Sequence, residues 1–566
     1  SVRCVVAEAG AAYERIGEDR YRVHPARLDD LKALLGDAFG EDSPCIGVAH
    51  LFSLDASDAT AEGALEQAHT AGCVSALCLI QAFAQRGLRD APRLALVTSG
   101  VHLLAASEGG APVQAPLAGL AAVIGHEHPE LRCAHVDLGA RPSAEEIASL
   151  AEELLLDAPE DRVALRGSAR HVARLVRWRQ ATPAPAAAPR TITAEGAYLI
   201  TGGLGGLGLR LAAWLVGQGA RHIALAGRSA PTAEAERALA QLRGLGADVR
   251  AYGADVSQAG EVARLLSAID AELPPLRGIF HAAGVLDDGV LSQLDERRMR
   301  AVLSPKVDGA FHLHAQTLGR PLDLFVMFSS AASVLGSPGQ GNYAAANAFL
   351  DALAHHRRAA GLHGLSVGWG PWAEVGLAAA ASSRGERLAQ RGVRSMQPDQ
   401  ALSALGRLLP EDVAQVIVAP LDLRQWREFY LTAAQSPFLS VLMQEQASRA
   451  APRKGDARDL LAAAAPGRRL GLLVAYLREQ VGRILQLDPA RIELEQPLGA
   501  LGLDSLTGLE LRNRLESGLK LTLPATLIFA YPTVAALSTH LARKLDLSFD
   551  EAPSAVDGEE ATALAS

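Results

Sequence analysis

Short apolar runs alternate with amphipathic stretches over most of the chain. Residues 45–52 and 94–98 are apolar runs typical of buried strands, whereas residues 61–86 carry apolar side chains at helical spacing. The same alternation starts again at Gly196 and continues to about residue 430. Because strands that alternate with helices form parallel sheets covered by helices, the pattern predicts an α/β protein with two doubly wound, Rossmann-like subdomains.

The two halves of this region look like a degenerate repeat. Residues 48–55 (Val-Ala-His-Leu-Phe-Ser-Leu-Asp) are similar to residues 279–287 (Ile-Phe-His-Ala-Ala-Gly-Val-Leu-Asp), and residues 94–100 are similar to residues 324–330. The first half has no glycine-rich turn, however, and neither Tyr nor Asn follows Ser99 up to residue 125. We therefore expect the first half to keep the sheet and to lack the chemistry.

Changes in composition mark the boundaries between units. An Ala/Pro-rich stretch separates the two halves, and a polar segment follows the second half. Residues 470–487 and 505–519 then carry apolar side chains at helical spacing, which predicts a compact helical unit. The acidic, small-residue C-terminus is typical of a disordered tail. The expected units are residues 1–190 and 191–435 (the two halves), 436–465 (linker), 466–543 (helical unit) and 544–566 (tail).

Length and charge restrict the possible functions. A chain of 566 residues is too long for one core and suggests roughly three or four domains. The net charge of −9 gives no reason to expect a nucleic-acid partner. No apolar run reaches about 18 residues, so we expect no membrane span. Five cysteines at irregular spacing argue against a disulfide framework, which favours a reduced, cytoplasmic protein. The absence of an initial Met indicates a segment of a longer polypeptide.

A glycine-rich turn follows the short apolar run at residues 197–201. Residues 209–218 have helical spacing, so the turn connects a predicted strand to a predicted helix. Glycines at such a turn allow the backbone to approach a pyrophosphate at the helix N-terminus. An ordinary turn is the alternative, but the strand–turn–helix context favours dinucleotide binding. The expected cofactor cradle is Gly202, Gly203, Leu204, Gly205, Gly206, Leu207 and Gly208.

Residues at the ends of the next three predicted strands would complete the cofactor site. Arg228 and Ser229 stand where NAD-dependent enzymes place an acid that binds the ribose hydroxyl. Because Arg and Ser suit a 2′-phosphate instead, we predict NADPH; an Arg that simply faces solvent is the alternative. Two further groups are expected along the cofactor: Asp255 and Val256 near the adenine, and the small residues Ala282, Ala283 and Gly284.

Four polar residues downstream suit the reduction of a ketone, which needs a hydride donor and an acid. Tyr343 is the candidate acid, and because a free phenol has a pKa near 10, it benefits from a cationic neighbour such as Lys306. Ser330 would donate a hydrogen bond to the carbonyl oxygen as charge develops there. Asn347 follows Tyr343 by one helical turn and would hold a proton-relay water.

This set resembles the short-chain dehydrogenase/reductase superfamily. The shared features are the glycine turn, Ser330, and Tyr343 thirteen residues later. Common members carry Tyr-Xaa3-Lys, whereas here Asn347 follows the Tyr and the lysine lies upstream, as Lys306. That exchange is similar to the ketoreductase domains of modular polyketide synthases and animal-type fatty acid synthases. The resemblance covers nearly the whole chain and implies that the first half is a structural subdomain.

Further residues resemble the stereochemical markers of polyketide ketoreductases. Leu286, Asp287 and Asp288 match the Leu-Asp-Asp motif of B-type domains, which yield the D-configured hydroxyl. Two solvated acids on a loop are the alternative. A-type domains have Trp eight residues before the Tyr, where this chain has Leu335. Ala345 stands where epimerising B-type domains often have Pro, so we expect reduction without epimerisation.

Ser505 begins the second predicted helix of the C-terminal unit. No histidine or other base lies nearby in sequence, which argues against a nucleophilic role. A helix N-cap at Asp504 or Ser505 is the plain alternative. The segment Leu501-Gly-Leu-Asp-Ser-Leu506 resembles the 4′-phosphopantetheine attachment site of acyl carrier proteins. The resemblance implies a four-helix-bundle carrier domain with phosphopantetheine bound covalently to Ser505 by a separate phosphopantetheinyl transferase.

A metal site is not expected. His126 and His128 lie close together, but they belong to the half that lacks the glycine turn, and the sequence shows no third ligand. The cysteines are typical of ordinary buried thiols.

The resemblance as a whole implies an NADPH-dependent ketoreductase fused to its acyl carrier protein. Its substrate would be a β-ketoacyl thioester on the carrier arm, and its partners a ketosynthase and an acyltransferase within a dimeric polyketide synthase. The alternatives are a carrier module with a vestigial reductase, an animal-type fatty acid synthase fragment, and a free-standing NADPH dehydrogenase. The complete set of Tyr343, Lys306, Ser330 and Asn347, called the tetrad below, disfavours a vestigial reductase. Ser505 disfavours a free-standing dehydrogenase. The identity of the polyketide stays open.

Overall fold

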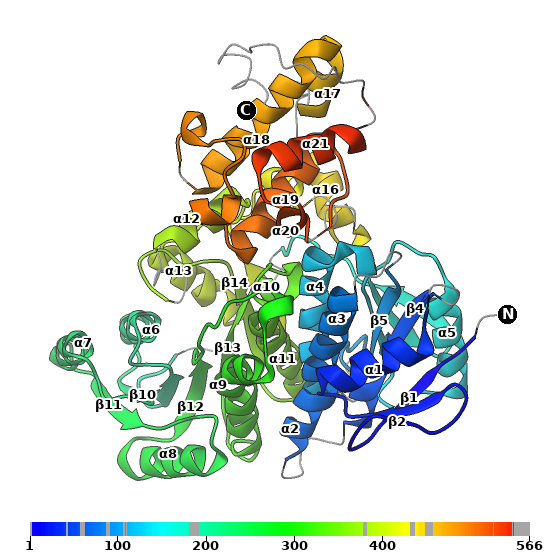
Figure 1. The fold of residues 1–566 in the computed structure, drawn as a ribbon. Helices are drawn as coiled ribbons and strands as arrows, with labels where there is room; N and C mark the ends of the chain where they lie inside the picture. The colour runs from blue at the N-terminus through cyan, green and yellow to red at the C-terminus, as the bar shows by residue number, and fades with distance from the viewer. Residues whose placement is uncertain are drawn as a thin grey trace. The chain divides into compact units, whose positions relative to one another are not determined.

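The chain forms two compact units in the computed structural model (Figure 1). One unit comprises residues 1–125 and 131–421, and the other comprises residues 126–130 and 422–566. The Ala/Pro-rich stretch and the acidic tail beyond residue 547 lie outside the described residues. The structure describes residues 3–40, 44–56, 63–86, 91–105, 108, 110–179, 192–376, 382–430, 436–447, 457–485, 487–524, 526–545 and 547.

A seven-stranded parallel sheet organises the second half of the first unit. Its strands are β9 (Ala197–Thr201), β10 (His222–Gly227), β11 (Asp248–Gly253), β12 (Leu276–His281), β13 (Leu324–Ser330), β14 (Leu365–Trp369) and β15 (Gln415–Val418). The spatial order β11-β10-β9-β12-β13-β14-β15 reverses direction between β9 and β12. Ligands of open parallel sheets bind at the carboxyl ends of the strands beside such a reversal. A ligand of this sheet is therefore expected at the carboxyl ends of β9 and β12.

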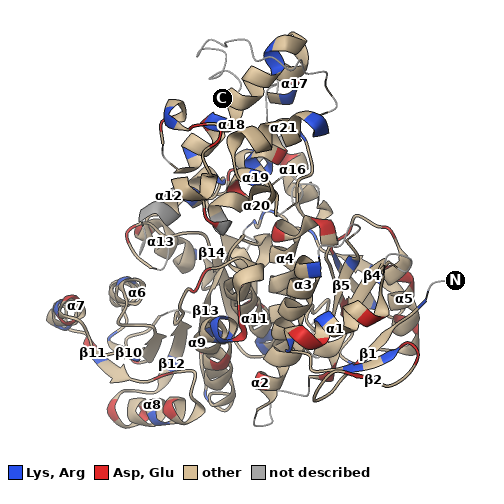
Figure 2. Cartoon of the chain, in the orientation of Figure 1, with Lys and Arg blue, Asp and Glu red and all other residues tan. Residues whose placement is uncertain are grey.

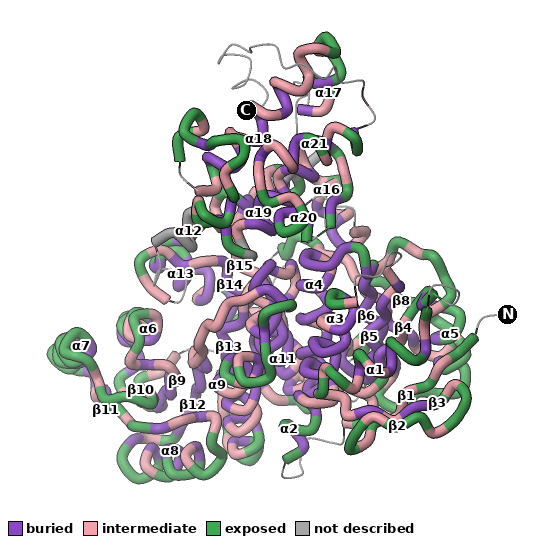
Figure 3. The backbone as a smooth tube through the Cα atoms, in the orientation of Figure 1, coloured by how far each residue is buried: buried purple, intermediate pink, exposed green. Residues whose placement is uncertain are grey.

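Helices cover both faces of this sheet. They are α6 (Gly206–Gly217), α7 (Ala233–Gly244), α8 (Ala259–Glu272), α9 (Glu296–Ala315), α10 (Ala332–Leu335), α11 (Gly341–Ala359), α12 (Ser382–Gln390) and α13 (Pro398–Leu408). Leu211 of α6 and Leu405 of α13 bury one face. Leu265 of α8 and Phe349 of α11 bury the other face. Strands β13 and β14 are consequently buried along their length, as Figure 3 shows, which explains their nearly continuous apolar sequences.

The first half contains a smaller sheet in the order β4-β5-β6-β7-β8. Strands β4 to β7 are parallel, and β8 returns antiparallel to β7 through a turn in which Gly167 has φ +58°. The elements are β4 (Gly47–His50), β5 (Arg93–Ser99), β6 (Ala134–Leu138), β7 (Arg162–Arg166), β8 (Ala169–Val172), α1 (Leu28–Ala38), α2 (Ala64–His69), α3 (Ser75–Arg86), α4 (Pro116–Glu127) and α5 (Ala144–Leu155). The predicted fold class, with two Rossmann-like sheets, is confirmed.

The N-terminal region differs from the sequence expectation in two respects. A three-stranded sheet of β1 (Val6–Ala9), β2 (Glu14–Arg15) and β3 (Arg20–Val23) precedes α1, and no apolar pattern predicted it, because its strands are short and mostly exposed. The single helix expected at residues 61–86 is two helices joined by a π-helical turn at Thr70–Val74. Such turns insert a residue without removing the apolar spacing that predicted the helix.

The two halves of the first unit share one apolar core. Leu77 of α3 and Leu120 of α4 belong to the same cluster as Phe349 of α11. Gly119 of α4 makes this contact close, because a Cβ atom placed on it would lie 2.4 Å from the carbonyl oxygen of Ala344. The first half therefore supports α11, the helix that carries Tyr343.

The C-terminal unit is helical, as predicted. Its elements are α14 (Leu423–Phe429), α16 (Ser440–Ala447), α17 (Ala457–Ala463), α18 (Pro466–Leu485), α19 (Ser505–Leu519), α20 (Leu527–Ala530) and α21 (Val534–Lys544). Leu473 and Leu515 lie in its core together with Leu461 of α17. Within the expected polar linker, residues 436–465, the helices α16 and α17 form, and α17 packs into the helical core. Its apolar positions are too few to give a helical signal by themselves.

Charged residues of both signs lie together on α7 and α8, whereas β9 and β13 carry none (Figure 2). These two surface helices therefore present no basic stripe of the kind that binds nucleic acid. Among the described residues, no helix combines the length and apolar character needed to cross a bilayer.

Replacing Gly119 by Ala should destabilise the first unit. The added methyl group meets the Ala344 backbone at 2.4 Å, and such overpacking typically costs about 1–3 kcal/mol. Gly125→Ala in the same helix is the matched control, because a Cβ atom there has no neighbour within 4 Å and the helix gains up to about 1 kcal/mol from the alanine. Thermal denaturation followed by circular dichroism measures both effects. Equal melting temperatures for the two variants would contradict the close contact.

Candidate active site

The glycine turn lies at the carboxyl end of β9, beside the reversal point of the sheet. Gly202 has φ +66°, which favours glycine, and a Cβ atom on it would lie 3.0 Å from the backbone of Ala283. A Cβ atom on Gly203 would lie 2.7 Å from the Ile200 oxygen, and one on Gly208 would lie 2.5 Å from the Gly202 oxygen. These three glycines are therefore required by the close packing of the turn itself.

Gly205 and Gly206 have a different role. Both are exposed, Gly205 is the N-cap of α6, and neither would place a Cβ atom against other backbone closer than 3.5 Å. The start of α6 is therefore open to a ligand, and the N-terminus of a helix attracts phosphate. Leu204 and Leu207 pack against the apolar core and so hold the turn in place. This cradle fits a dinucleotide pyrophosphate.

The other expected cofactor residues follow β10, β11 and β12 at the same edge of the sheet. Arg228 and Ser229 are exposed directly after β10. Asp255 uses its carboxylate locally, accepting hydrogen bonds from Ser257 N at 3.0 Å and Ser257 Oγ at 2.8 Å. Val256 is 5% exposed and packs against Gly309, so its side chain faces the core. Any contact of Val256 with a cofactor would come from its backbone.

Ala282, Ala283 and Gly284 form the floor between the cofactor cradle and Lys306. Ala283 N donates to Thr201 Oγ1 at 3.3 Å, which joins the ends of β9 and β12. A Cβ atom on Gly284 would lie 2.9 Å from Lys306 Cε. Glycine is therefore needed here for the lysine to approach the end of β12.

Lys306 lies in the middle of α9 and is 3% exposed. Its Nζ donates a hydrogen bond to the Phe328 oxygen at 2.9 Å and lies 5.6 Å from the ring centroid of Tyr343. Burial lowers the pKa of Lys306 to about 8, and the negative charge of Asp351 opposes that change. The structure thus brings together Lys306 and Tyr343, which are 37 positions apart in the sequence.

Tyr343 and Asn347 share one face of α11. Asn347 Nδ2 donates to the backbone carbonyl oxygen of Tyr343 at 2.8 Å. Asn347 is fully buried, and its Oδ1 accepts no hydrogen bond from any described residue. A buried acceptor without a partner is costly, so this atom is suited to accept a hydrogen bond from a water molecule or a ligand.

Ser330 ends β13 next to this pair. Its Oγ accepts a hydrogen bond from Ala332 N at 3.2 Å, which leaves the hydroxyl proton available for donation. The neighbouring Ser329 Oγ donates to the backbone carbonyl oxygen of Asn347 at 3.2 Å, and the backbone carbonyl of Phe328 accepts from Lys306. Consecutive residues of β13 therefore bond to Lys306 and to the backbone of Asn347, and the strand ends at Ser330.

The Leu286-Asp287-Asp288 segment is held by residues that the sequence did not single out. The Asp287 carboxylate lies 2.6 Å from Arg298 Nη2, and Arg298 Nη2 also donates to the backbone carbonyl oxygen of Asp288 at 2.7 Å. Asn342 Nδ2 donates to the backbone carbonyl oxygen of Asp287 at 2.9 Å. This fixes the loop to the residue before Tyr343. Asn342 adjoins a predicted catalytic residue, but nothing local distinguishes Arg298 from other charged residues on a helix surface.

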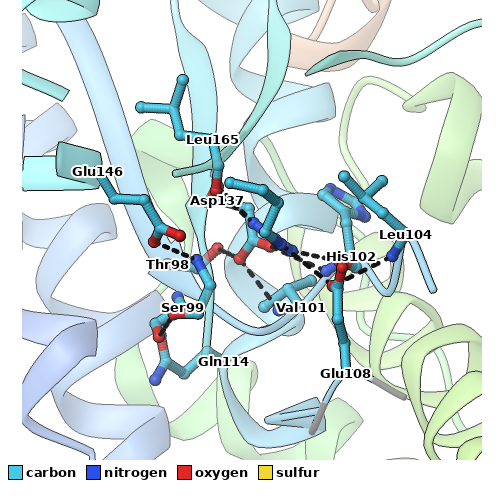
Figure 4. A network of polar contacts seen from close by, with 12 residues as sticks. Thr98, Ser99, Val101, His102, Leu104, Glu108, Gln114, Asp137, Glu146 and Leu165 are labelled. Carbon is cyan, nitrogen blue, oxygen red and sulfur yellow. Dashed lines mark hydrogen bonds and ion pairs between the residues drawn. The ribbon is translucent and has the colours of Figure 1, made fainter. Parts of the chain in front are cut away.

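The corresponding edge of the smaller sheet is closed by its own side chains (Figure 4). Asp137, at the end of β6, accepts from Thr98 Oγ1 at 2.7 Å, from the N–H groups of Val101 and His102 at 3.0 Å, and from Arg166 at 2.9 Å. Burial alone would raise the pKa of Asp137, but the neighbouring histidines and these donors lower it. The edge that holds the cofactor cradle in the larger sheet is therefore filled here. Among the described residues, no group of three potential ligands could hold a metal ion.

Ser505 is the first residue of α19, and Asp504 caps that helix. Asp504 Oδ1 accepts from Thr507 N at 2.7 Å, and Thr507 Oγ1 accepts from Asp504 N at 2.8 Å. The capping role that sequence alone left open between the two residues thus belongs to Asp504. The Ser505 side chain lies outside the described part of the structure.

The two Rossmann-like sheets, the glycine cradle and the tetrad define an oxidoreductase. Three family models match parts of the chain. The KR domain matches residues 196–374, the phosphopantetheine attachment site matches residues 475–541, and the Rossmann fold domain of the polyketide synthase extender module SpnB matches residues 4–175.

Solved structures agree with these matches. One described as A-type ketoreductases from a modular polyketide synthase is 34% identical, with a TM-score of 0.66, and covers 76% of this chain and 90% of that chain. A C2-type ketoreductase from a modular polyketide synthase is 30% identical, with a TM-score of 0.65, and covers 75% of this chain and 91% of that chain. The chain belongs to the ketoreductases of modular polyketide synthases, and an acyl carrier region follows the reductase region in the sequence.

Curated relatives are much longer. Polyketide synthase GfsA of Streptomyces halstedii is 37% identical over 564 residues, which is 96% of this chain and 7% of that protein. The spectinabilin polyketide synthase system protein NorB of Streptomyces orinoci is 43% identical over 62% of this chain and 16% of that protein. The chain therefore spans less than a fifth of the length of these two relatives.

Replacing Asp504 by Ala should weaken the start of α19, because it removes the side-chain oxygen that accepts the hydrogen bond from Thr507 N in the capping box. A loss of about 1 kcal/mol corresponds to roughly five-fold faster hydrogen exchange at the first-turn amides. Ser505→Ala, at the next position, is the control and should leave those exchange rates unchanged. An equal increase in both variants would assign the cap to both residues.

Proposed function

We propose that the chain reduces a β-ketoacyl group that is held as a thioester on phosphopantetheine attached to Ser505. The observation that carries this proposal is the position of the buried Lys306 ammonium, 5.6 Å from the ring centroid of Tyr343. A cation beside a phenol favours the phenolate and so makes Tyr343 a better proton donor. The intact tetrad supports an active reductase over a vestigial one.

NADPH, when bound along the glycine cradle, supplies the hydride that attacks the β-carbonyl carbon. The chain's own residues handle the proton. Tyr343 donates its phenolic proton to the carbonyl oxygen as negative charge develops there, and the Ser330 hydroxyl stabilises the same oxygen by a hydrogen bond. Asn347 Oδ1 holds the water through which Tyr343 is reprotonated. The ketone gains one hydride and one proton and becomes a secondary alcohol.

We further propose that the product is the D-configured hydroxyl, formed without epimerisation. Leu286, Asp287 and Asp288 provide the B-type motif, and Arg298 and Asn342 hold that motif rigidly beside the helix that carries Tyr343. Rigid placement matters, because the face of the ketone that meets the hydride depends on how the substrate enters. Structures of A-type and C2-type ketoreductases have TM-scores of 0.66 and 0.65 with this chain, so the overall fold does not distinguish the types.

The proposal extends to the setting of the reductase. The carrier segment requires a phosphopantetheinyl transferase, and the substrate requires a ketosynthase and an acyltransferase upstream. Attachment to Ser505 raises the local concentration of the substrate, so a weak affinity between the two units suffices. We infer a place within a dimeric, cytoplasmic megasynthase.

A single assay separates reduction from carrying. With NADPH and a soluble β-ketobutyryl pantetheine thioester, Tyr343→Phe should lower kcat at least about 100-fold, because the proton donor is lost. Ser505→Ala should reduce the same soluble thioester normally but gain no phosphopantetheine mass when treated with a transferase. Chiral chromatography of the product should give the D-hydroxyl.

Each part of this assay has a result that counts against it. If the unaltered chain does not oxidise NADPH, the proposed reductase activity is contradicted. A phosphopantetheine adduct on Ser505→Ala contradicts the attachment site, and an L-hydroxyl contradicts the B-type assignment.

Arg228 should set the preference for NADPH. Its guanidinium is exposed directly after β10, where a 2′-phosphate would lie, and a lost charge-assisted hydrogen bond costs about 1.5–3 kcal/mol. Arg228→Ala should therefore raise the KM for NADPH about ten-fold or more and leave the KM for NADH unchanged. Arg264→Ala, an exposed arginine on α8, is the matched control. An equal rise in both KM values would exclude a 2′-phosphate contact.

A further inference from the structure

Asp351 is a buried carboxylate on α11 that the proposed reaction does not use. It follows Asn347 by four residues and Tyr343 by eight, so the three residues lie along one face of the helix. Asp351 is 6% exposed. Its carboxylate accepts hydrogen bonds from Ser333 Oγ at 2.6 Å and from Ser366 Oγ at 2.5 Å. A buried acid is costly, so a role for it is worth seeking.

The partners of Asp351 connect it to the end of β13. The Ser333 hydroxyl also lies 2.8 Å from the backbone carbonyl oxygen of Ser330. Its single proton is therefore shared between that carbonyl and Asp351, which links the carboxylate to the backbone of the proposed catalytic serine. Ser366 lies on β14 and pairs in register with Met327 of β13. The carboxylate therefore joins α11, the start of α10 and strands β13 and β14 directly behind the tetrad.

Charge also couples Asp351 to Lys306. Burial raises the pKa of Asp351 to about 6, while its serine donors and the positive charge of Lys306 oppose that change. The negative charge of Asp351 in turn opposes the lowering of the Lys306 pKa by burial. Between about pH 6 and pH 8 both groups are therefore ionised.

Among the described residues, the other groups that face this pair are few. Lys306 meets the His281 imidazole from β12, the Tyr343 ring from α11 and the Phe328 carbonyl from β13. Burial, followed by the charge of Lys306, lowers the pKa of His281 to about 3, so His281 stays neutral over the working range of pH. Besides Lys306, the groups that face Asp351 are neutral hydroxyls, those of Ser333, Ser366 and Ser329.

We propose that Asp351 is a positioning residue of the reductase, which holds the Ser330 backbone through Ser333 and supplies the negative charge that keeps Lys306 protonated. This inference rests on the proposed function, because it takes Lys306 and Tyr343 as the groups that carry the reduction. The observations that support it are the two short hydrogen bonds to the carboxylate and its enclosure behind the tetrad.

The test is the pH dependence of the full chain with Asp351→Asn, a change that removes the charge and keeps the shape. The substrate is a β-ketobutyryl pantetheine thioester with NADPH. In the unaltered chain kcat should fall as the pH rises through about 8, because Lys306 then loses its proton. Asp351→Asn should move this fall to lower pH by about one pH unit. At pH 8, kcat should then be lower by about five-fold, because the protonated fraction of Lys306 falls from about one half to about one tenth. The KM for NADPH should be unchanged.

Two further variants separate charge from packing. Ser366→Ala removes one hydrogen bond and keeps the carboxylate, so it should lower kcat without moving the pH at which kcat falls. Asp351→Glu restores the charge and should restore that pH, even where its longer side chain lowers kcat. Circular dichroism and thermal denaturation confirm that each variant is folded.

A second readout does not depend on activity. The chain has five lysines, so a sample labelled with 13C at lysine Cε gives few signals, and Lys306→Arg identifies the one from Lys306. The Lys306 titration should move to lower pH in Asp351→Asn and stay in place in Ser366→Ala. An unchanged titration in Asp351→Asn overturns the proposal. A uniform loss of kcat at every pH does the same, since it indicates a purely structural role.

Failure of this proposal can be told apart from failure of the proposed function. If the unaltered chain oxidises no NADPH, both the proposed reductase activity and the positioning role of Asp351 are contradicted. If the chain is active, Tyr343→Phe is inactive and Asp351→Asn keeps the original pH profile, only the positioning role is contradicted.

Discussion

The ammonium group of Lys306 is enclosed where α9, α11 and the end of β13 meet. An isolated charge in such a place is strongly unfavourable, and here a backbone carbonyl, an aromatic ring and a buried carboxylate offset that cost. Each partner comes from a defined position on a helix or strand. Displacing any of these elements would leave a charge without its partner. The same interaction therefore fixes the packing of the larger sheet and the electrostatics of the proposed proton donor.

The smaller subdomain contributes to this arrangement without chemistry of its own. Its carboxyl edge is filled by the hydrogen bonds around Asp137, and its helix α4 contacts the backbone of α11 through Gly119. A repeated fold thus serves two purposes within one unit. One copy keeps an open edge with a glycine cradle, and the other keeps a closed edge and supports the helix that carries Tyr343. The close backbone contact explains why the two copies share one core.

In the C-terminal unit, the residue before Ser505 performs the structural work. Asp504 caps α19, so the serine need not contribute its hydroxyl to the helix. This division of roles suits the proposed attachment site, because the cap of α19 is made by Asp504. In the reductase, Arg298 similarly holds Asp287 and so fixes the stereochemical motif. In both places another residue makes the structural contact that holds the proposed functional segment.

Local patterns in the sequence determined much of this protein. Apolar periodicity predicted the two Rossmann-like halves and the helical carrier unit, because each predicted helix or strand is a short local pattern. The glycine turn and the segment around Ser505 are also local signals, whereas the tetrad is spread over residues 306–347 and was predicted from residue types and a family resemblance. The small N-terminal sheet, the packing of α17, the side chain of Val256 facing the core and the anchoring of Asp287 by Arg298 gave no such signal. Asp351 is the clearest case, since its partners come from α10, β14 and α9. Only tertiary structure brings those residues together, and a buried charge acquires its role from what surrounds it.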